Sequence, residues 1–174
     1  MNKAVFLDRD GVINEVLSKR VKFVNKPEQM YLLEGVGEGV KFLNDSGFLV
    51  FVVTNQGGIG LGYMKEDMLL KVHKKMKDDI REYGGKIDDI IYCPHKPQAG
   101  CVCRKPEPEM LHRLAERHQV NLNESYMVGD RDVDIIAGKQ AGTKTILIGE
   151  EEGLADYRFP SLYEAAKWLT TKVN

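Results

Sequence analysis

Two aspartates one residue apart, Asp8 and Asp10, follow the apolar run 4–7, which is typical of a buried strand. Ligands of open α/β sheets collect outside the carboxyl ends of the strands, so both carboxylates are expected at a crevice and not in the core. Gly11 lets the chain turn sharply there. Two carboxylates this close repel each other unless a cation or a shared proton relieves them, and oxygen ligands favour Mg²⁺. A polar turn that merely contains aspartates is the alternative.

A second polar group follows the next apolar run, 49–53, where Thr54 and Asn55 lead into Gln56, Gly57 and Gly58. The hydroxyl and the backbone N–H groups of such a turn can face a phosphate, and Asn55 is a candidate substrate-binding residue. Taken alone the signal is weak, because glycine-rich loops are more often plain turns.

Asp130 follows the apolar run 126–128 and is therefore expected beside Asp8 and Asp10. A third carboxylate would complete a Mg²⁺ site at this edge of the sheet. Asp132, which opens the next helical pattern, is interpreted as a helix cap or dipole partner.

Lys105 stands directly before Pro106, which is expected to begin a helix at Glu107. Most lysines in a charged protein are solvated. A lysine at the mouth of a cleft lined by carboxylates is nevertheless a candidate phosphate clamp.

All three cysteines of the chain and one of its four histidines, His95, lie between positions 93 and 103. Cys93, His95, Cys101 and Cys103 match the closed tetrahedral set of a structural zinc ion, which keeps no open position for catalysis. The odd cysteine count argues against a disulfide scaffold. A loop with free or transiently oxidised cysteines is the alternative. The remaining histidines fall in helical patterns and are interpreted as ordinary surface or half-buried residues; they are His73, His112 and His118.

These residues resemble the four motifs of the haloacid-dehalogenase (HAD) phosphohydrolases, which are Asp-x-Asp, a strand-terminal Thr or Ser, a Lys, and Gly-Asp-x-x-x-Asp. All four occur in order and spread over most of the chain; they are Asp8/Asp10, Thr54, Lys105 and Asp130/Asp134.

The HAD resemblance implies a chemical role for each motif. Asp8 would attack phosphorus and form an aspartyl-phosphate, which water then hydrolyses, and Asp10 would act first as the acid and then as the base. Mg²⁺ would bind Asp8, the backbone carbonyl of Asp10, and Asp130, while Thr54 and Lys105 would stabilise the developing charge.

The Cys-x-His…Cys-x-Cys-Arg-Lys-Pro loop resembles a zinc-loop branch of this family, whose members act on heptose 1,7-bisphosphate or on histidinol phosphate. By resemblance Arg104 and Arg131 would bind substrate. The basic segment after Asp10, with Lys19, Arg20 and Lys22, is expected to add cations to the pocket. A basic lining suits a second phosphate and favours removal of the 7-phosphate of D-glycero-D-manno-heptose 1,7-bisphosphate. The short spacing from His95 to Cys101 points instead to histidinol phosphate.

The positioning elements are apolar runs that alternate with helical patterns. The runs lie at 4–7, 49–53, 90–92, 126–128 and 145–148, and the helical patterns at 37–44, 65–83, 107–118, 132–141 and 161–169. This alternation predicts an α/β fold with a three-layer, Rossmann-like parallel sheet, which is the HAD fold. The segments between the motifs are too short to contain a cap domain, so the fold should be capless with a zinc-bound loop.

At 174 residues and a net charge of −1, the chain is expected to form one domain, residues 1–174, without a nucleic-acid partner. No apolar run approaches the ~18 residues of a membrane span, and strand residues begin at position 4, so a cytoplasmic protein without a membrane partner is expected. A monomer is also expected. The partner would be a small phosphate ester. A receiver-type phospho-acceptor switch is the non-enzymatic alternative, but it would lack an acid two residues after the nucleophile.

Overall fold

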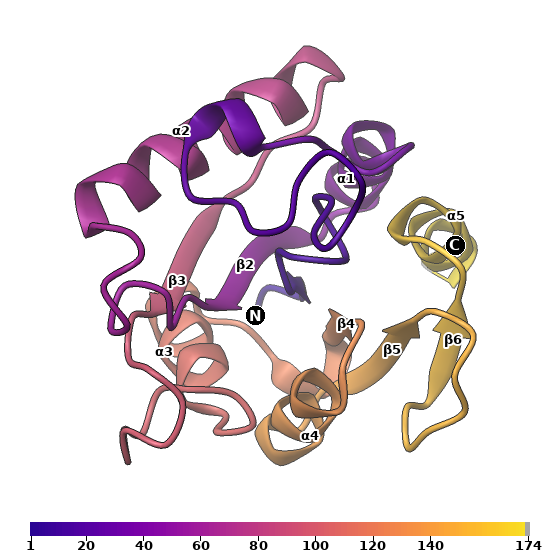
Figure 1. Ribbon diagram of the computed structural model, residues 1–174. Coiled ribbons are helices and arrows are strands. Elements are labelled where there is room, and N and C mark those ends of the chain that lie inside the picture. Colours follow the sequence, from indigo (N-terminus) through magenta and orange to yellow (C-terminus); the bar gives the residue numbers. More distant parts are fainter. Residues whose placement is uncertain (173–174) are drawn as a thin grey trace.

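The fold is built around one parallel β-sheet, seen in a computed structural model that describes residues 1–172 (Figure 1). The strand order is β3-β2-β1-β4-β5-β6. The strands are β1 (Ala4–Leu7), β2 (Leu49–Asn55), β3 (Asp89–Cys93), β4 (Tyr126–Gly129), β5 (Lys144–Ile148) and β6 (Tyr157–Phe159).

The central strands are apolar on both faces, as strands covered by helices on both sides must be. In β1, Val5 and Leu7 pack into one hydrophobic cluster, whereas Ala4 and Phe6 pack into the other. This alternation follows from the two-residue period of a strand. Leu7 pairs with Val128 of β4, so the residues after these two strands emerge side by side.

Helices cover both faces of the sheet (Figure 1). One face carries α1 (Val36–Asp45), α2 (Glu66–Glu82) and α5 (Leu162–Lys172), and the other carries α3 (Glu109–His118) and α4 (Asp132–Ala141). Gly47, Gly84 and Gly142 all adopt the positive φ expected after a helix end. The predicted three-layer α/β fold is confirmed.

Two features differ from the sequence-based expectation. The short strand β6 was not predicted, because its three residues are half-exposed or exposed and lack an apolar run. Helix α3 begins at Glu109 and not at Glu107, since Pro108 occupies its N-cap.

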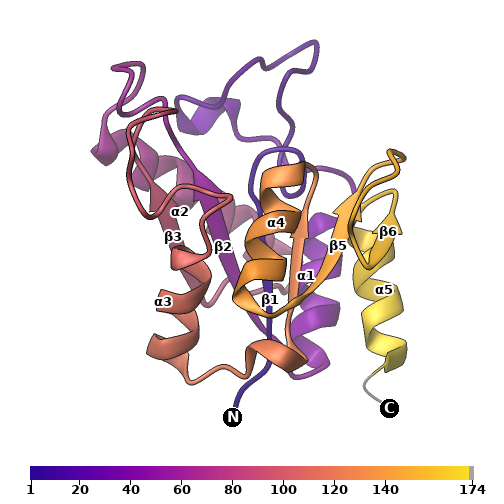
Figure 2. The ribbon, with the colours of Figure 1, turned by 90° about the horizontal axis from the view of Figure 1, so that it is seen from below.

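The long loops after β1, β2 and β3 gather at the carboxyl end of the sheet, opposite the N-terminus (Figure 2). Between β1 and β2 the chain forms only loops, the 3₁₀ helix Pro27–Gln29 and α1. Between β2 and β3 it forms a loop and α2, so neither segment contains a cap domain. Within residues 1–172 we find no helix both long and apolar enough to cross a bilayer.

Candidate active site

Asp8 and Asp130 lie at the carboxyl ends of the neighbouring strands β1 and β4. The backbone N–H of Asp8 donates to the carbonyl of Val128 at 2.9 Å, which continues the pairing of the two strands by one residue. Gly11 has a φ of 86°, and a Cβ built on it would lie 2.1 Å from Oδ2 of Asp130. Only glycine therefore allows the turn after β1 to approach the second carboxylate this closely.

Lys105 is buried between two carboxylates at the centre of the site. Its Nζ lies 2.9 Å from Oδ1 of Asp8 and 2.7 Å from Oδ1 of Asp134, and it also donates to the carbonyl of Val53 at 2.8 Å. Lys105 and Asp134 are only 2% and 1% exposed, and Asp8 is 8% exposed. Asp8 and Lys105 therefore lie at the floor of the site and not on its rim, although Lys105 still lines a cleft.

The charges at this site shift one another's titration. Burial raises the pKa of Asp8 to about 8, with Asp134 acting in the same direction and Lys105 against it. Burial disfavours the ammonium of Lys105, but Asp8 and Asp134 together raise its pKa above the usual value. Burial and then Asp134 also raise the pKa of Asp130. The cluster thus favours an added cation.

The residues fit a divalent cation of the Mg²⁺ type. Oxygen atoms of Asp8, Asp130 and Asp134 lie within 4.8 Å of one another. Oδ1 of Asp130 is buried and has no hydrogen-bond partner among residues 1–172. Both oxygens of Asp134 are engaged, one by Lys105 and the other by the N–H of Arg131 at 3.2 Å. Asp8 and Asp130 are therefore the carboxylates best placed to bind the ion.

The side chain of Asp10 turns away from this cluster toward groups that the sequence did not indicate. Its Oδ1 accepts hydrogen bonds from Nε and NH2 of Arg9, at 3.2 and 2.9 Å, and from Nδ2 of Asn14 at 3.0 Å. NH1 of Arg9 lies 3.1 Å from Nε2 of His73. The expected metal contact of Asp10 is through its backbone carbonyl, which these side-chain bonds do not involve.

His73 is buried at 4% exposure, so its interpretation as a surface or half-buried residue is wrong. The sequence did hold a signal, since position 73 falls on the buried face of α2 with Leu69, Met76 and Ile80. Burial and then the charge of Arg9 lower the pKa of His73 to about 3, so the ring is neutral.

Thr54 and Asn55 end β2 at the edge of the same site. The hydroxyl of Thr54 accepts a hydrogen bond from Nε2 of Gln56 at 2.8 Å. The amide of Asn55 bonds the backbone of Lys105 twice, since its Oδ1 accepts from the N–H at 2.9 Å and its Nδ2 donates to the carbonyl at 3.1 Å. The side chain of Asn55 therefore fixes the loop that carries Lys105.

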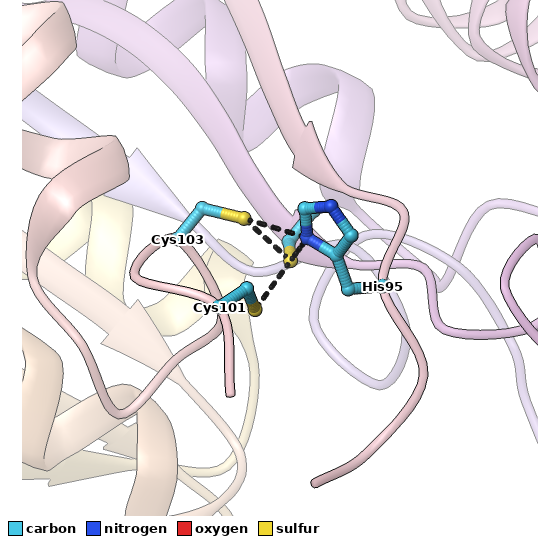
Figure 3. A group of neighbouring side chains, drawn as sticks. His95, Cys101 and Cys103 are labelled. Atoms are coloured by element: carbon cyan, nitrogen blue, oxygen red, sulfur yellow. Dashed lines mark hydrogen bonds between the residues drawn. The ribbon is translucent and has the colours of Figure 1, made fainter. Parts of the chain in front are cut away.

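The structure brings the four expected zinc ligands together (Figure 3). Nδ1 of His95 lies 3.2 Å from Sγ of Cys103 and 3.4 Å from Sγ of Cys93, and the sulfurs of Cys93 and Cys101 are 3.6 Å apart. All four ligand atoms lie within 4.8 Å of one another. A soft, tetrahedral donor set of this kind fits Zn²⁺.

The two arginines expected to bind substrate line one cleft of about 340 Å³. Arg104 and Arg131 border it together with Asn55, Lys105 and the tip of the Cys/His loop. Arg104 donates to the carbonyl of His95 at 3.3 Å, while the side chain of Arg131 is exposed. This arginine cleft is positively charged beside the buried acids.

A second cleft, of about 490 Å³, borders Asp10 and Asn55. Its wall includes Phe23, Leu61 and Tyr63, whose exposed fractions are at least 50%. From the loop after Asp10, Lys22 is the basic residue that lines this cleft. Arg20 does not contribute as expected, because it pairs with Glu15 and stacks over Tyr31, 3.8 Å from the ring centre. This Asp10 cleft is therefore less basic than the sequence suggested.

Comparisons with known proteins define the class. The model of the HAD-hydrolase-like family matches residues 102–159, which include Lys105, Asp130 and Asp134. The D-glycero-β-D-manno-heptose-1,7-bisphosphate 7-phosphatase of Pseudomonas putida is 36% identical over 151 residues, or 87% of this chain and 85% of that protein. The corresponding α-anomer 7-phosphatase of Photorhabdus laumondii is 36% identical over 147 residues, or 80% of this chain and 78% of that protein.

A solved structure supports the same family assignment. A D,D-heptose 1,7-bisphosphate phosphatase from B. bronchiseptica, crystallised with magnesium and phosphate, has a TM-score of 0.87 and 33% identity, covering 98% of this chain and 99% of that one. The chain therefore belongs to the HAD-like hydrolases, in the group that contains the heptose bisphosphate phosphatases. It is a phosphatase, and these matches exclude the alternative of a receiver-type phospho-acceptor switch.

Proposed function

We propose that this phosphatase removes the 7-phosphate of D-glycero-D-manno-heptose 1,7-bisphosphate with Mg²⁺ as its catalytic ion. The observation that carries the proposal is the arginine cleft, which offers Arg104 and Arg131 to a second phosphate close to the buried carboxylates. The curated relatives named above support the same substrate. In this proposal residues 1–174 act as one domain, as a cytoplasmic monomer.

In the first step, an oxygen of Asp8 forms a bond to phosphorus as the bond from phosphorus to the ester oxygen breaks. The electron pair passes to the ester oxygen, which takes a proton from Asp10. Lys105 and Thr54 stabilise the charge on the phosphoryl oxygens, and Asp134 holds Lys105 in place.

In the second step, Asp10 removes a proton from water, whose oxygen attacks phosphorus while the bond to Asp8 breaks and inorganic phosphate leaves. Asp8, Asp130 and the backbone carbonyl of Asp10 would hold Mg²⁺, which neutralises the phosphoryl oxygens when it is bound. Cys93, His95, Cys101 and Cys103 would hold a structural Zn²⁺.

Histidinol phosphate is the second candidate substrate. The short loop between His95 and Cys101 favours it, and the apolar wall formed by Phe23 and Tyr63 would suit an imidazole ring. The two candidates differ in charge, because the heptose carries a second phosphate and histidinol carries an amine.

A side-by-side assay of phosphate release tests the proposal. We expect a higher kcat/KM for the heptose 1,7-bisphosphate than for histidinol phosphate. Arg104→Ala should raise KM for the bisphosphate more than for heptose 7-phosphate, whereas Arg113→Ala, an exposed arginine on α3, should change neither. A better turnover of histidinol phosphate would show that loop length was the better guide.

A further inference from the structure

We propose that Arg9 and His73 are positioning residues that hold the carboxylate of Asp10 for proton transfer. His73 would act on the reaction through Arg9, from a helix that contributes no motif residue. The inference rests on the proposed role of Asp10 as acid and base. It assigns a purpose to a buried polar network that neither the fold nor the metal ligands require.

Arg9 is among the largest fully buried side chains, at 1% exposure. A buried guanidinium is costly unless each N–H group finds a partner. Nε and NH2 of Arg9 both donate to Oδ1 of Asp10, and NH1 points at Nε2 of His73. Two edges of the planar group are thus fixed at once, which a flexible single cation could not achieve.

The ring of His73 must be an acceptor in this arrangement, because a guanidinium can only donate. Nε2 therefore carries the lone pair, and the proton of the neutral ring lies on Nδ1. The burial of His73 and the adjacent positive charge keep the ring in this neutral form. His73 lies on the buried face of α2 beside Val72 and Met76, so helix packing sets its position.

Asp10 gains a single orientation from these contacts. The three hydrogen bonds from Arg9 and Asn14 all end on Oδ1. The carboxylate is still 32% exposed and borders the Asp10 cleft, where Gln56 also contacts it, and we assign proton transfer to Oδ2 because it carries none of these three bonds. A general acid held by one oxygen delivers its proton from the other at a fixed place, whereas a rotating carboxylate would often be misplaced.

The experiment compares His73→Leu with His73→Gln. Leucine removes the acceptor, while glutamine offers a carbonyl oxygen to Arg9. Two substrates are used: an alkyl phosphate ester, whose leaving alkoxide needs a proton, and nitrophenyl phosphate, whose leaving group departs without one. In a single turnover, His73→Leu should slow release of the leaving alcohol from the alkyl ester roughly 10- to 100-fold and release of nitrophenolate only little, because only this first step differs between the two substrates. His73→Gln should restore most of the lost rate.

Two controls make the outcomes decisive. Val72→Ala shortens a buried apolar side chain on the same helix, which cannot hydrogen-bond to Arg9, so it reports the effect of looser packing. An equal loss with both substrates, a selective loss in Val72→Ala, or no loss in His73→Leu would overturn the inference. Asp10→Asn tests the underlying role separately. If it fails to show the selective loss, the acid and base role falls and takes the inference with it, whereas a failure in His73→Leu alone leaves that role intact.

Discussion

The two clusters of metal-ligand side chains are built in opposite ways. The carboxylate cluster, Asp8, Asp130 and Asp134 around Lys105, joins segments far apart in the sequence at the ends of β1 and β4 and the start of α4. The Cys/His cluster, Cys93 to Cys103, comes from the end of β3 and the loop that follows it. In the first cluster Asp8 and Asp134 are buried and Asp130 is half-buried, whereas in the second only Cys93 is buried.

This difference shows what fixes the side-chain positions in each cluster. Backbone pairing of β1 with β4 places the carboxylates, so the fold alone preforms them. The Cys/His loop is joined to the segment after β2 near its start, where the N–H of Gly60 donates to the carbonyl of Pro94 at 2.9 Å, and a bound ion would order the remainder of the loop. The two regions meet at Lys105, which lies two residues after Cys103 and reaches into the carboxylate cluster. Four variants separate the two regions, from the largest expected effect to the smallest.

Asp8→Asn should abolish turnover, by at least about 10⁴-fold, because an amide cannot attack phosphorus. Stability should change little, since the sheet and not the charge holds this position and Lys105 keeps its contact with Asp134. Steady-state phosphate release and chemical denaturation check both statements. Measurable turnover by pure Asp8→Asn protein would falsify the nucleophile assignment.

Lys105→Met should lower kcat by about 10²- to 10³-fold and destabilise the ion-free protein by about 3–5 kcal/mol. The large cost arises because Asp8 and Asp134 are left buried without their cation. Added Mg²⁺ should return part of the stability, which denaturation with and without the ion would reveal. A variant as stable as the wild type in chelator would show that the ion pairs do not support the cluster.

Cys101→Ser should lower kcat roughly tenfold, because a loosened loop misplaces Arg104 and Lys105 while Asp8 stays in place. Metal analysis should find about one zinc ion per chain in the wild type and less in the variant. Val102→Ser is the matched control, since Val102 lies in the same loop and is 71% exposed. Full activity in a zinc-free wild type would refute both the site and its purpose.

The smallest expected effect is the contribution of His73 to the pH dependence of stability, in the region that the sheet holds in place. The pKa of His73 is depressed to about 3 from an ordinary 6.5, so its contribution to stability is present above about pH 6.5 and is lost as the pH falls toward 3. Between pH 7 and pH 5 this should cost about 2 kcal/mol. His73→Gln should lack this part of the pH dependence. Because the Cys/His cluster is common to both proteins, equal slopes would mean that His73 is not buried as described.

Much of the site could be predicted from the sequence because its residues follow apolar runs. Asp8 and Asp130 come directly after a strand and Thr54 lies at the end of one, and parallel strands bring such positions to one edge of a sheet. The four expected zinc ligands could be found equally well from the sequence, since they lie in one short segment. Local pattern was sufficient in both cases.

The remaining features depend on contacts between distant segments. Arg9 and His73 are 64 positions apart in the sequence, and no motif or spacing at either position predicts their contact. Lys105 was expected as a phosphate clamp at a cleft mouth, and its burial could not be predicted because it depends on two carboxylates from other elements. Strand β6 was missed because its pairing with β5, and not its composition, makes it a strand.

The double hydrogen bond between Asn55 and the backbone of Lys105 has a consequence for motion. The side-chain amide of Asn55 bonds both the N–H and the carbonyl of Lys105, as a neighbouring strand would bond one residue of a parallel sheet. The loop that carries Lys105 is therefore attached to the end of β2. A capless enzyme has no second domain to swing shut, so any closure over the substrate must come from loops. Since the Lys105 loop is tied to β2, we expect it to move less than the segments that line the Asp10 cleft, such as the one that carries Lys22 and Phe23.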